Sequence, residues 1–174
     1  PEQVRSLFRN SRIIGRRFKI AHVFFGREII EVATFRADQS ESSSKESHHK
    51  HRVSGETGMI TRDNVYGTID QDAVRRDFTV NALYYNAENE TILDFMDGIK
   101  DLDNKAMNLI GDAATRYRED PVRMLRAVRL AQKLDLNIEK NSQQLIPEMA
   151  HLLGHISNAR LWEESLKLFL AGHA

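Results

Sequence analysis

The order of apolar and polar positions predicts a mixed α/β structure in the first part of the chain. Apolar side chains recur at helical spacing within residues 2–9. Two apolar runs, at 18–25 and 29–35, are separated by Gly26-Arg27, and this arrangement predicts a β-hairpin. Residues 38–58 are mainly Ser, His, Lys and Glu with almost no apolar side chain, which predicts a mobile loop.

A third apolar pattern, within residues 73–85, predicts a helix. The side chains on its apolar stripe are Val74, Phe78, Ala82 and Tyr85. Asp77 and Asn81 are four residues apart and therefore share another face of the predicted helix. Residues 91–95 are typical of a strand, and Asp97-Gly98 is typical of a turn.

After about residue 105 the pattern becomes helical almost throughout, so we expect a domain boundary at roughly 105–112. One helix is predicted to begin at Pro121, with Asp120 as its cap, and to run to about Leu134. A last helix is predicted to follow Ser157-Asn158 and to end near residue 172. The first domain is thus expected to be α/β and the second all-α.

The amino-acid composition excludes several classes of protein and of metal site. The 174 residues carry no net charge and include no cysteine, which excludes disulfides and cysteine-ligated metals and fits a cytoplasmic protein. No apolar run approaches the ~20 residues that span a bilayer, so no membrane association is expected.

The histidines within 38–58 could bind a metal, but no acid or cysteine stands at a regular spacing beside them, which favours a solvated loop. Arginines cluster at 12–17, 75–76 and 116–129, where local patches can bind phosphate.

The helix from Pro121 combines an apolar face with a row of cations. The cationic side chains, which occupy one arc of the helix, are Arg123, Arg126, Arg129 and Lys133. One interpretation is a solvated basic face. The other is a surface for phosphate or for a base edge, which the use of arginine at three of the four positions favours.

Asp120 precedes Arg123 by three residues, so a carboxylate and a guanidinium can project side by side. Such a pair can read adenine, because the carboxylate accepts from the 6-amino group while the arginine donates to a ring nitrogen. The alternative is an ion pair at a helix end, worth less than ~1 kcal/mol.

A second polar cluster is the run Arg75-Arg76-Asp77 with Asn81. Arginines at a helix N-terminus oppose the helix dipole, and a bound triphosphate would explain them. Asp77 and Asn81 could then hold ribose hydroxyls. The alternative is the plain start of a surface helix.

Glu31 interrupts the apolar run at 29–35. A buried, unpaired carboxylate costs several kcal/mol, so this side chain needs a metal ion, an arginine or an exposed position on an edge strand. The residue types leave these three possibilities open.

Four segments in this order resemble the class II nucleotidyltransferases, the family that contains bacterial poly(A) polymerases and tRNA CCA-adding enzymes. They are residues 13–23, 30–36, 75–83 and 118–127. The likeness extends over nearly the whole chain apart from 38–58, and the four motifs together are highly specific. Gly-Arg-Arg-Phe at 15–18 is similar to the poly(A) polymerase branch.

The resemblance implies a polymerase-β-like nucleotidyltransferase head, incomplete at its N-terminus, over residues 1–108, and a helical neck that binds nucleotide and RNA over 109–174. It implies ribose and triphosphate binding by Arg76, Asp77 and Asn81, base recognition by Asp120 and Arg123, and a phosphate contact by Arg126. Arg16, Arg17 and Arg129 are further candidates for RNA or phosphate binding.

The resemblance also assigns residues outside the nucleotide site. Arg160 and Glu164 match a motif that braces the base-reading helix, although four-residue spacing is also that of an ordinary surface salt bridge. Residues 94–101 match a hinge-like connection between head and neck. Glu31 is similar to the family's third catalytic carboxylate, a ligand of Mg²⁺.

The activity that the resemblance implies is template-independent transfer of AMP from ATP to RNA 3′ ends, with Mg²⁺ as cofactor. The family's Gly-Gly turn and Asp-x-Asp metal pair are expected upstream of Pro1, so the isolated chain is expected to be inactive. A CCA-adding enzyme is the nearest alternative, and a noncatalytic RNA-binding protein is an alternative of another class. Protein partners are not predicted.

Overall fold

A computed structural model describes residues 1–15, 19–37 and 66–170. Of these, the residues up to Asp72 form one compact unit, and those from Ala73 onward form a second. Arg16, Arg17 and the loop predicted at 38–58 lie outside the described residues. Across the described residues, no helix combines the length and apolar character needed to cross a membrane.

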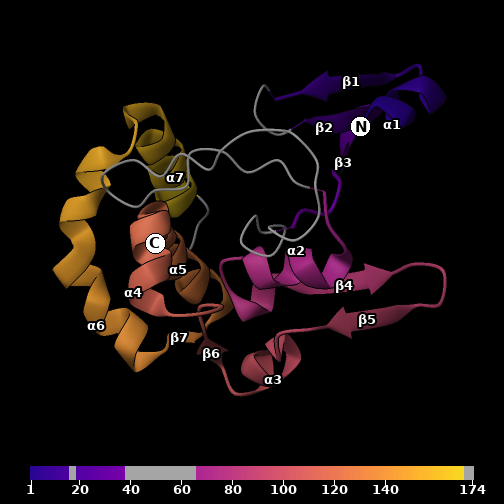
Figure 1. Cartoon of the computed structure of the whole chain (residues 1–174). Helices are drawn as coiled ribbons and strands as arrows, with labels where there is room; N and C mark the ends of the chain where they lie inside the picture. Colours follow the sequence, from indigo (N-terminus) through magenta and orange to yellow (C-terminus); the bar gives the residue numbers. More distant parts are fainter. Residues whose placement is uncertain (16–18, 38–65, 171–174) are drawn as a thin grey trace, which may run out of the picture. The chain divides into compact units, whose positions relative to one another are not determined.

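The first unit contains an antiparallel sheet covered on one face by a short helix (Figure 1). Helix α1 (Glu2–Leu7) precedes β1 (Ser11–Ile14), β2 (Ile20–Phe25) and β3 (Glu28–Val32), which pair in the order β1-β2-β3. Ser11, Ala21 and Val23 are buried and share one face of the sheet, and α1 contacts β1 and β2. Because side chains alternate between faces, Arg12, His22 and Glu31 follow one another in register across the other.

The predicted hairpin is confirmed as β2 and β3, although β3 ends at Val32 and the strand before Gly15 is separate. Gly26 has φ 61° at the turn, a left-handed conformation that favours glycine.

The helix predicted over residues 73–85 is wrong. Helix α2 (Ile69–Arg75) ends early and is followed by a 3₁₀ turn, η2 (Thr79–Asn81), and by the hairpin of β4 (Leu83–Asn86) and β5 (Thr91–Asp94). Phe78 is buried in the core, but Val74 and Tyr85 on the expected apolar stripe are exposed.

Tertiary pairing explains this break. Phe78 forms a β-bridge with Leu109, the Thr79 N–H donates to the Asn108 carbonyl at 3.1 Å, and the Ile110 N–H donates to the Asp77 carbonyl at 3.0 Å. These hydrogen bonds need an extended backbone, which a continuing α-helix would not supply.

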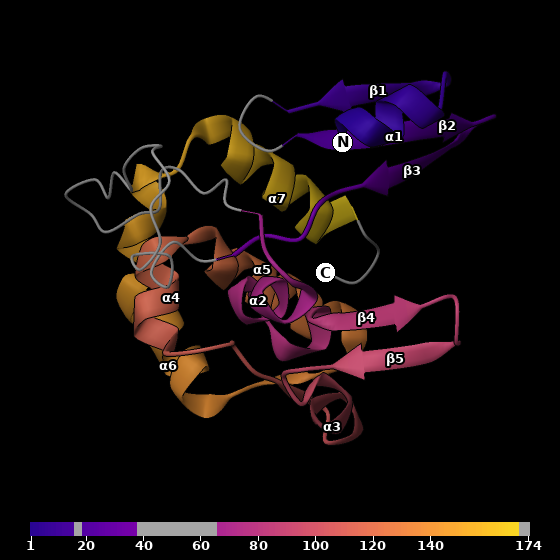
Figure 2. The ribbon, with the colours of Figure 1, turned by 45° about the vertical axis from the view of Figure 1, so that its right-hand side comes forward.

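Helices make up most of the second unit after Asp94. They are α3 (Gly98–Asp103), α4 (Ala113–Glu119), α5 (Val122–Leu134), α6 (Lys140–Met149), the 3₁₀ helix η3 (Ala150–His155) and α7 (Asn158–Leu170), with a short parallel pair of β6 (Ala106–Met107) and β7 (Asn137–Ile138). Helices α4 to α7 lie together, and the β4–β5 hairpin extends away from them (Figure 2). The helices predicted from Pro121 and after Ser157 are therefore confirmed as α5 and α7.

The segment between β5 and α3 is held by side-chain oxygens. Asp94 accepts hydrogen bonds from the N–H groups of Met96, Gly98 and Ile99. Asp101 is buried and accepts from Thr79 Oγ1 at 2.6 Å. A Cβ on Gly98 would lie 2.4 Å from the Thr79 carbonyl oxygen, so the close approach of the two backbones requires glycine. The hinge-like role of this segment stays a prediction.

Tyr117 on α4 is fully buried in the core with Met124 and Met149, and its hydroxyl donates to the Ser142 carbonyl at 3.3 Å. Burial, and secondarily the charge of Glu139, raises the pKa of Tyr117 from 10.0 to about 12.

Unfolding should therefore become easier above pH 10. The unfolded chain loses the Tyr117 proton near pH 10, while the folded chain keeps it to about pH 12, so stability is lost as pH rises through this window. Two pKa units correspond to about 3 kcal/mol. We expect Tyr117→Phe to flatten the fall of the urea midpoint between pH 9.5 and about 11.5; an unchanged pH dependence would contradict this expectation.

Candidate nucleotide-binding site

Asp77 lies at the centre of a polar cluster that combines distant parts of the chain. Its Oδ2 accepts from Arg126 Nε at 2.6 Å and Nη2 at 2.5 Å, and its Oδ1 accepts from Asn81 Nδ2 at 3.1 Å. Its side chain is only 10% exposed. The structure thus brings together three of the residues that the sequence suggested for ribose and phosphate binding. Asp77 Oδ1 also accepts from the Phe78 N–H at 3.0 Å, so four donors already occupy the roughly four lone-pair directions of this carboxylate, and a ribose hydroxyl would have to replace one of them.

Arg75 and Arg76 lie at the end of α2, not at the start of a helix. The prediction that these arginines oppose a helix dipole is wrong, because cations near a helix C-terminus are favourable. The guanidinium of Arg76 lies over the Tyr84 ring, 5.4 Å from its centroid. A nucleotide-binding role for Arg76 stays a prediction that depends on the family resemblance.

Two residues that the sequence reasoning missed, Arg116 and Glu119, connect this cluster to α5. Arg116 on α4 donates through Nη2 to the carbonyl oxygens of Arg75 at 2.9 Å and Arg76 at 2.5 Å. Its Nη1 donates to Glu119 Oε2 at 2.9 Å, and the same oxygen accepts from Arg123 Nη1 at 3.0 Å. Arg123 Nη1 also donates to the Arg116 carbonyl at 2.8 Å.

These three side chains are each less than 20% exposed, so the network lies largely out of solvent. Burial, followed by the charge of Arg123, lowers the pKa of the Arg116 guanidinium. The four-residue spacing of Glu119 and Arg123 was a signal in the sequence, because it is the spacing of helical ion pairs. Nothing in the local sequence indicated that Arg116 reaches the carbonyls of Arg75 and Arg76, about 40 residues away.

The side chains of Asp120 and Arg123 do not pair with each other, although the Arg123 N–H donates to the Asp120 carbonyl at 3.0 Å. Asp120 Oδ2 accepts from Arg160 Nη2 at 2.6 Å, while Arg123 is held by Glu119. The residue that caps α5 is Pro121, and Asp120 Oδ1 accepts from the Val122 N–H at 3.3 Å. Base recognition by Asp120 and Arg123 stays a prediction.

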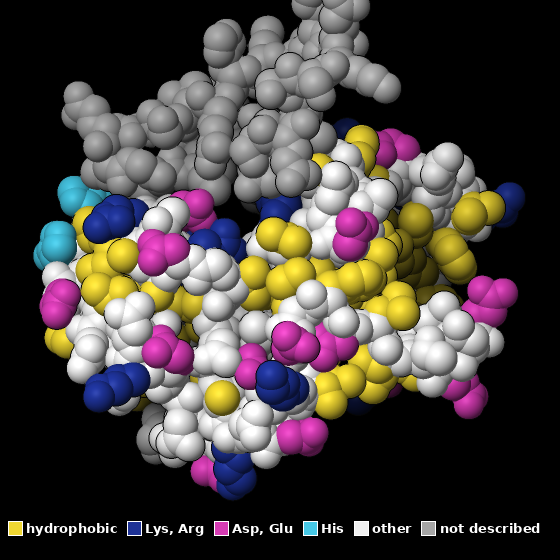
Figure 3. Space-filling model, turned by 60° about the horizontal axis from the view of Figure 1, so that its bottom comes forward, with side chains coloured by type: hydrophobic (Ala, Val, Ile, Leu, Met, Phe, Trp, Pro, Cys, Tyr) yellow, Lys and Arg dark blue, Asp and Glu magenta, His cyan; other side chains and the backbone are white. Residues whose placement is uncertain are grey.

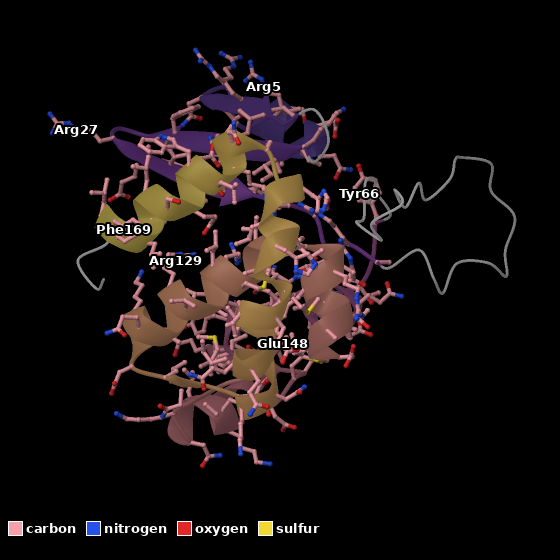
Figure 4. The ribbon with its side chains drawn as sticks, turned by 90° about the vertical axis from the view of Figure 1, so that its left-hand side faces the viewer. Arg5, Arg27, Tyr66, Arg129, Glu148 and Phe169 are labelled. Atoms are coloured by element: carbon pink, nitrogen blue, oxygen red, sulfur yellow. The ribbon has the colours of Figure 1, made fainter. Side chains whose placement is uncertain are left out.

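Helix α7 contacts α5 through a buried ion pair. Glu164 is 8% exposed, and its Oε2 lies 3.5 Å from Arg129 Nε, while its Oε1 accepts from Lys167 Nζ at 3.0 Å. Figure 4 shows Arg129 where α5 and α7 face each other. Arg160 and Glu164 therefore contact residues on or just before α5, as expected of a brace, instead of forming a salt bridge with each other.

Three of the four cations in the row on α5 do not form a solvated basic face, whereas the fourth, Lys133, is exposed. Arg123, Arg126 and Arg129 each pair with an acidic side chain, and their side chains are 12%, 32% and 15% exposed. Within the described residues, the positive charge of these arginines is directed inward to Glu119, Asp77 and Glu164. An RNA contact by Arg129 stays a prediction.

Glu31 belongs to the first unit and is exposed on β3, with 64% of its side chain accessible. His22 Nε2 lies 3.1 Å from its Oε1. Exposure explains how a carboxylate is tolerated in this apolar strand. Mg²⁺ is often held by one or two protein carboxylates together with substrate phosphates, so Glu31 fits as one ligand. In the described part of the chain, no group of three or more His, Cys, Asp or Glu side chains could hold a metal by itself.

Comparison with known proteins decides the family. A family model described as "Poly A polymerase head domain" matches residues 1–108, which is more than half of the chain. The chain belongs to the poly(A) polymerase head-domain family. A second model, "Probable RNA and SrmB- binding site of polymerase A", matches residues 135–174 of this family member.

Relatives of this head-domain protein include "Poly(A) polymerase I" of Haemophilus influenzae, which is 57% identical over 173 residues, and that of Escherichia coli O6:H1, which is 54% identical over 180 residues. Each alignment covers 99% of this chain and 37% of the relative. Among solved structures, the Bacillus stearothermophilus CCA-adding enzyme in complex with CTP aligns over 97% of this chain and 37% of its own, with a TM-score of 0.73 and 30% identity. The chain therefore spans little more than a third of the length of these proteins.

Proposed function

We propose that the full-length protein is a template-independent polynucleotide adenylyltransferase, which adds AMP from ATP to the 3′ ends of RNA. The observation that carries this proposal is the convergence of Asp77, Asn81 and Arg126, supplied by two distant segments, in a chain 57% identical to a poly(A) polymerase. The domain assignment belongs to the same proposal: residues 1–108 are the later part of a polymerase-β-like head, and residues 109–174 begin a helical neck that binds nucleotide and RNA.

Each polar group of the site has a proposed task. Asp77 accepts a ribose hydroxyl in exchange for one of its four present donors, while Asn81 and Arg126 position its carboxylate. The guanidinium groups of Arg76 and Arg126 attract the phosphates of ATP electrostatically. Asp120 and Arg123 form hydrogen bonds with the edge of adenine, and this recognition takes the place of base pairing with a template strand. Because Arg123 makes its contacts in the described residues through Nη1, its Nη2 and Nε can donate to a base.

In the proposed reaction, the RNA 3′ hydroxyl oxygen forms a bond to the α-phosphorus of ATP. The bond from that phosphorus to the oxygen bridging the α- and β-phosphates breaks, the hydroxyl proton passes to solvent, and pyrophosphate leaves. Mg²⁺, when bound, supplies charge stabilisation at the phosphates, with Glu31 as one proposed ligand. The side chains of this chain contribute by positioning the nucleotide and balancing its charge.

A CCA-adding enzyme is the second candidate, favoured by the fold shared with the CTP-bound enzyme. The two are separated by incubating full-length protein and Mg²⁺ with each nucleoside triphosphate, using a tRNA that lacks its CCA end and an unrelated RNA. We expect runs of A on both RNAs from ATP alone. Addition of C and A to the tRNA only would favour the CCA-adding enzyme, and no incorporation would favour a noncatalytic RNA-binding protein.

A further inference from the structure

Three arginines of the first unit line one hollow between α1 and the start of the sheet. The hollow has a volume of about 450 Å³ and is lined by Arg5, Arg9, Asn10, Ser11, Arg12 and Phe24. This volume lies within the ~300–1,000 Å³ of typical ligand pockets. Figure 4 shows Arg5 among basic side chains at one edge of this unit, well away from Arg27 on the β2–β3 turn.

Among residues 1–15, 19–37 and 66–170, no acidic side chain forms an ion pair with the arginines of this hollow. The acidic residues of α1 and of the three strands are Glu2, Glu28 and Glu31. Glu2 pairs with Lys19 at 2.7 Å, Glu31 lies 3.1 Å from His22 Nε2, and Glu28 is exposed at the start of β3. Within the described residues, none of the three arginines has an acidic partner. Elsewhere the charges are mixed, as on the face in Figure 3, where basic and acidic side chains are interspersed. Guanidinium groups held together without a counter-charge favour an anion with several oxygens.

Hydrogen bonds hold the walls of the hollow. Arg5 Nη1 donates to the Arg9 carbonyl at 2.9 Å, and Ser11 Oγ donates to the Phe8 carbonyl at 2.6 Å. Asn10 and Phe24 are bonded twice: the Phe24 N–H donates to the Asn10 carbonyl at 2.8 Å, and Asn10 Nδ2 donates to the Phe24 carbonyl. The arginines of the hollow therefore extend from a backbone that hydrogen bonds hold in place.

We infer that this hollow is a binding site for backbone phosphates of single-stranded RNA, separate from the residues matched to the RNA-binding model at 135–174. Cationic grooves beside an aromatic ring are the usual means of holding single strands without reading sequence, and Phe24 supplies such a ring here. The inference rests on the proposed function, because it assigns the RNA substrate to this site.

The test uses full-length protein and replaces Arg9 and Arg12, whose side chains make no hydrogen bond within the described residues. Arg9→Gln and Arg12→Gln are made singly and together, and Arg27→Gln is the control because it removes the same charge from an exposed site of the same unit. We expect the double variant to weaken binding of an unstructured 15-nucleotide RNA about tenfold. The slope of log K against log salt should fall by about 0.7 for each phosphate that the variant no longer neutralises.

The Michaelis constant for RNA should rise in the double variant, and that for ATP should not change. Unchanged RNA affinity and salt slope, or an equal loss in Arg27→Gln, would overturn the inference. Inorganic tripolyphosphate is the second ligand tested: a loss of tripolyphosphate binding with intact RNA binding would mean a free-anion site and would also overturn it. If the wild-type protein adds no AMP to RNA, the proposed function is refuted. This result leaves the inference about the hollow to be judged by the RNA-binding assay, which contains no ATP.

Discussion

Replacing Arg123 with alanine in the full-length protein is expected to lower the preference for ATP over CTP and GTP by tenfold or more. A good pair of hydrogen bonds to a base edge contributes about 1–3 kcal/mol of discrimination, and each 1.4 kcal/mol is a factor of ten. In the template-independent reaction that we propose, this discrimination has to come from side chains. The measurement is the ratio of kcat/KM for ATP, CTP and GTP with one RNA primer.

Two further variants separate base reading from loss of structure. Arg118→Ala removes an exposed arginine from α4 and should leave the ratio unchanged. Asp120→Asn should lower the ratio as Arg123→Ala does, because it removes the carboxylate that we propose as acceptor for the adenine amino group. Undiminished discrimination in Arg123→Ala would refute the assigned role of this residue. Glu119 keeps Arg116 as a partner in that variant, so the fold should survive.

Replacing Glu164 with alanine is expected to destabilise the chain by about 3 kcal/mol. The carboxylate is 8% exposed and lies beside two cations, Arg129 at 3.5 Å and Lys167 at 3.0 Å. Removing one member of a buried pair leaves the other charge without compensation, and this costs about 3–5 kcal/mol. Because Lys167 can turn to solvent, most of the cost comes from Arg129, whose side chain is 15% exposed.

Urea unfolding followed by the fluorescence of Trp162, the single tryptophan, measures this effect from within α7. Glu163→Ala is the matched control, since it removes an exposed carboxylate from the adjacent position of the same helix. If Glu164→Ala and Glu163→Ala unfold at the same urea concentration, the Arg129–Glu164 contact does not stabilise the packing of α7 on α5. We expect Glu163→Ala to stay within about 0.5 kcal/mol of the wild type.

Much of the secondary structure could be predicted because it follows from neighbouring residues. Helices α5 and α7 each combine a repeating apolar face with a start signal at Pro121 or Asn158, and both helices form. The hairpin of β2 and β3 follows from two apolar runs and a glycine that accepts positive φ. The helix expected over 73–85 failed because Phe78 and Thr79 pair with a segment some 30 residues away.

From the amino-acid sequence by itself came the family, the positions of the helices α5 and α7, and the proposal of Asp77, Asn81 and Arg126 as site residues, whereas Arg116 and Glu119 were missed. The ion-pair partners became known from the folded chain: Arg126 pairs with Asp77, Asp120 with Arg160, and Arg129 with Glu164. The physical reason is distance along the chain. Helical spacing reports which residues share a face, but an ion pair between residues 35 to 49 positions apart depends on how whole helices pack.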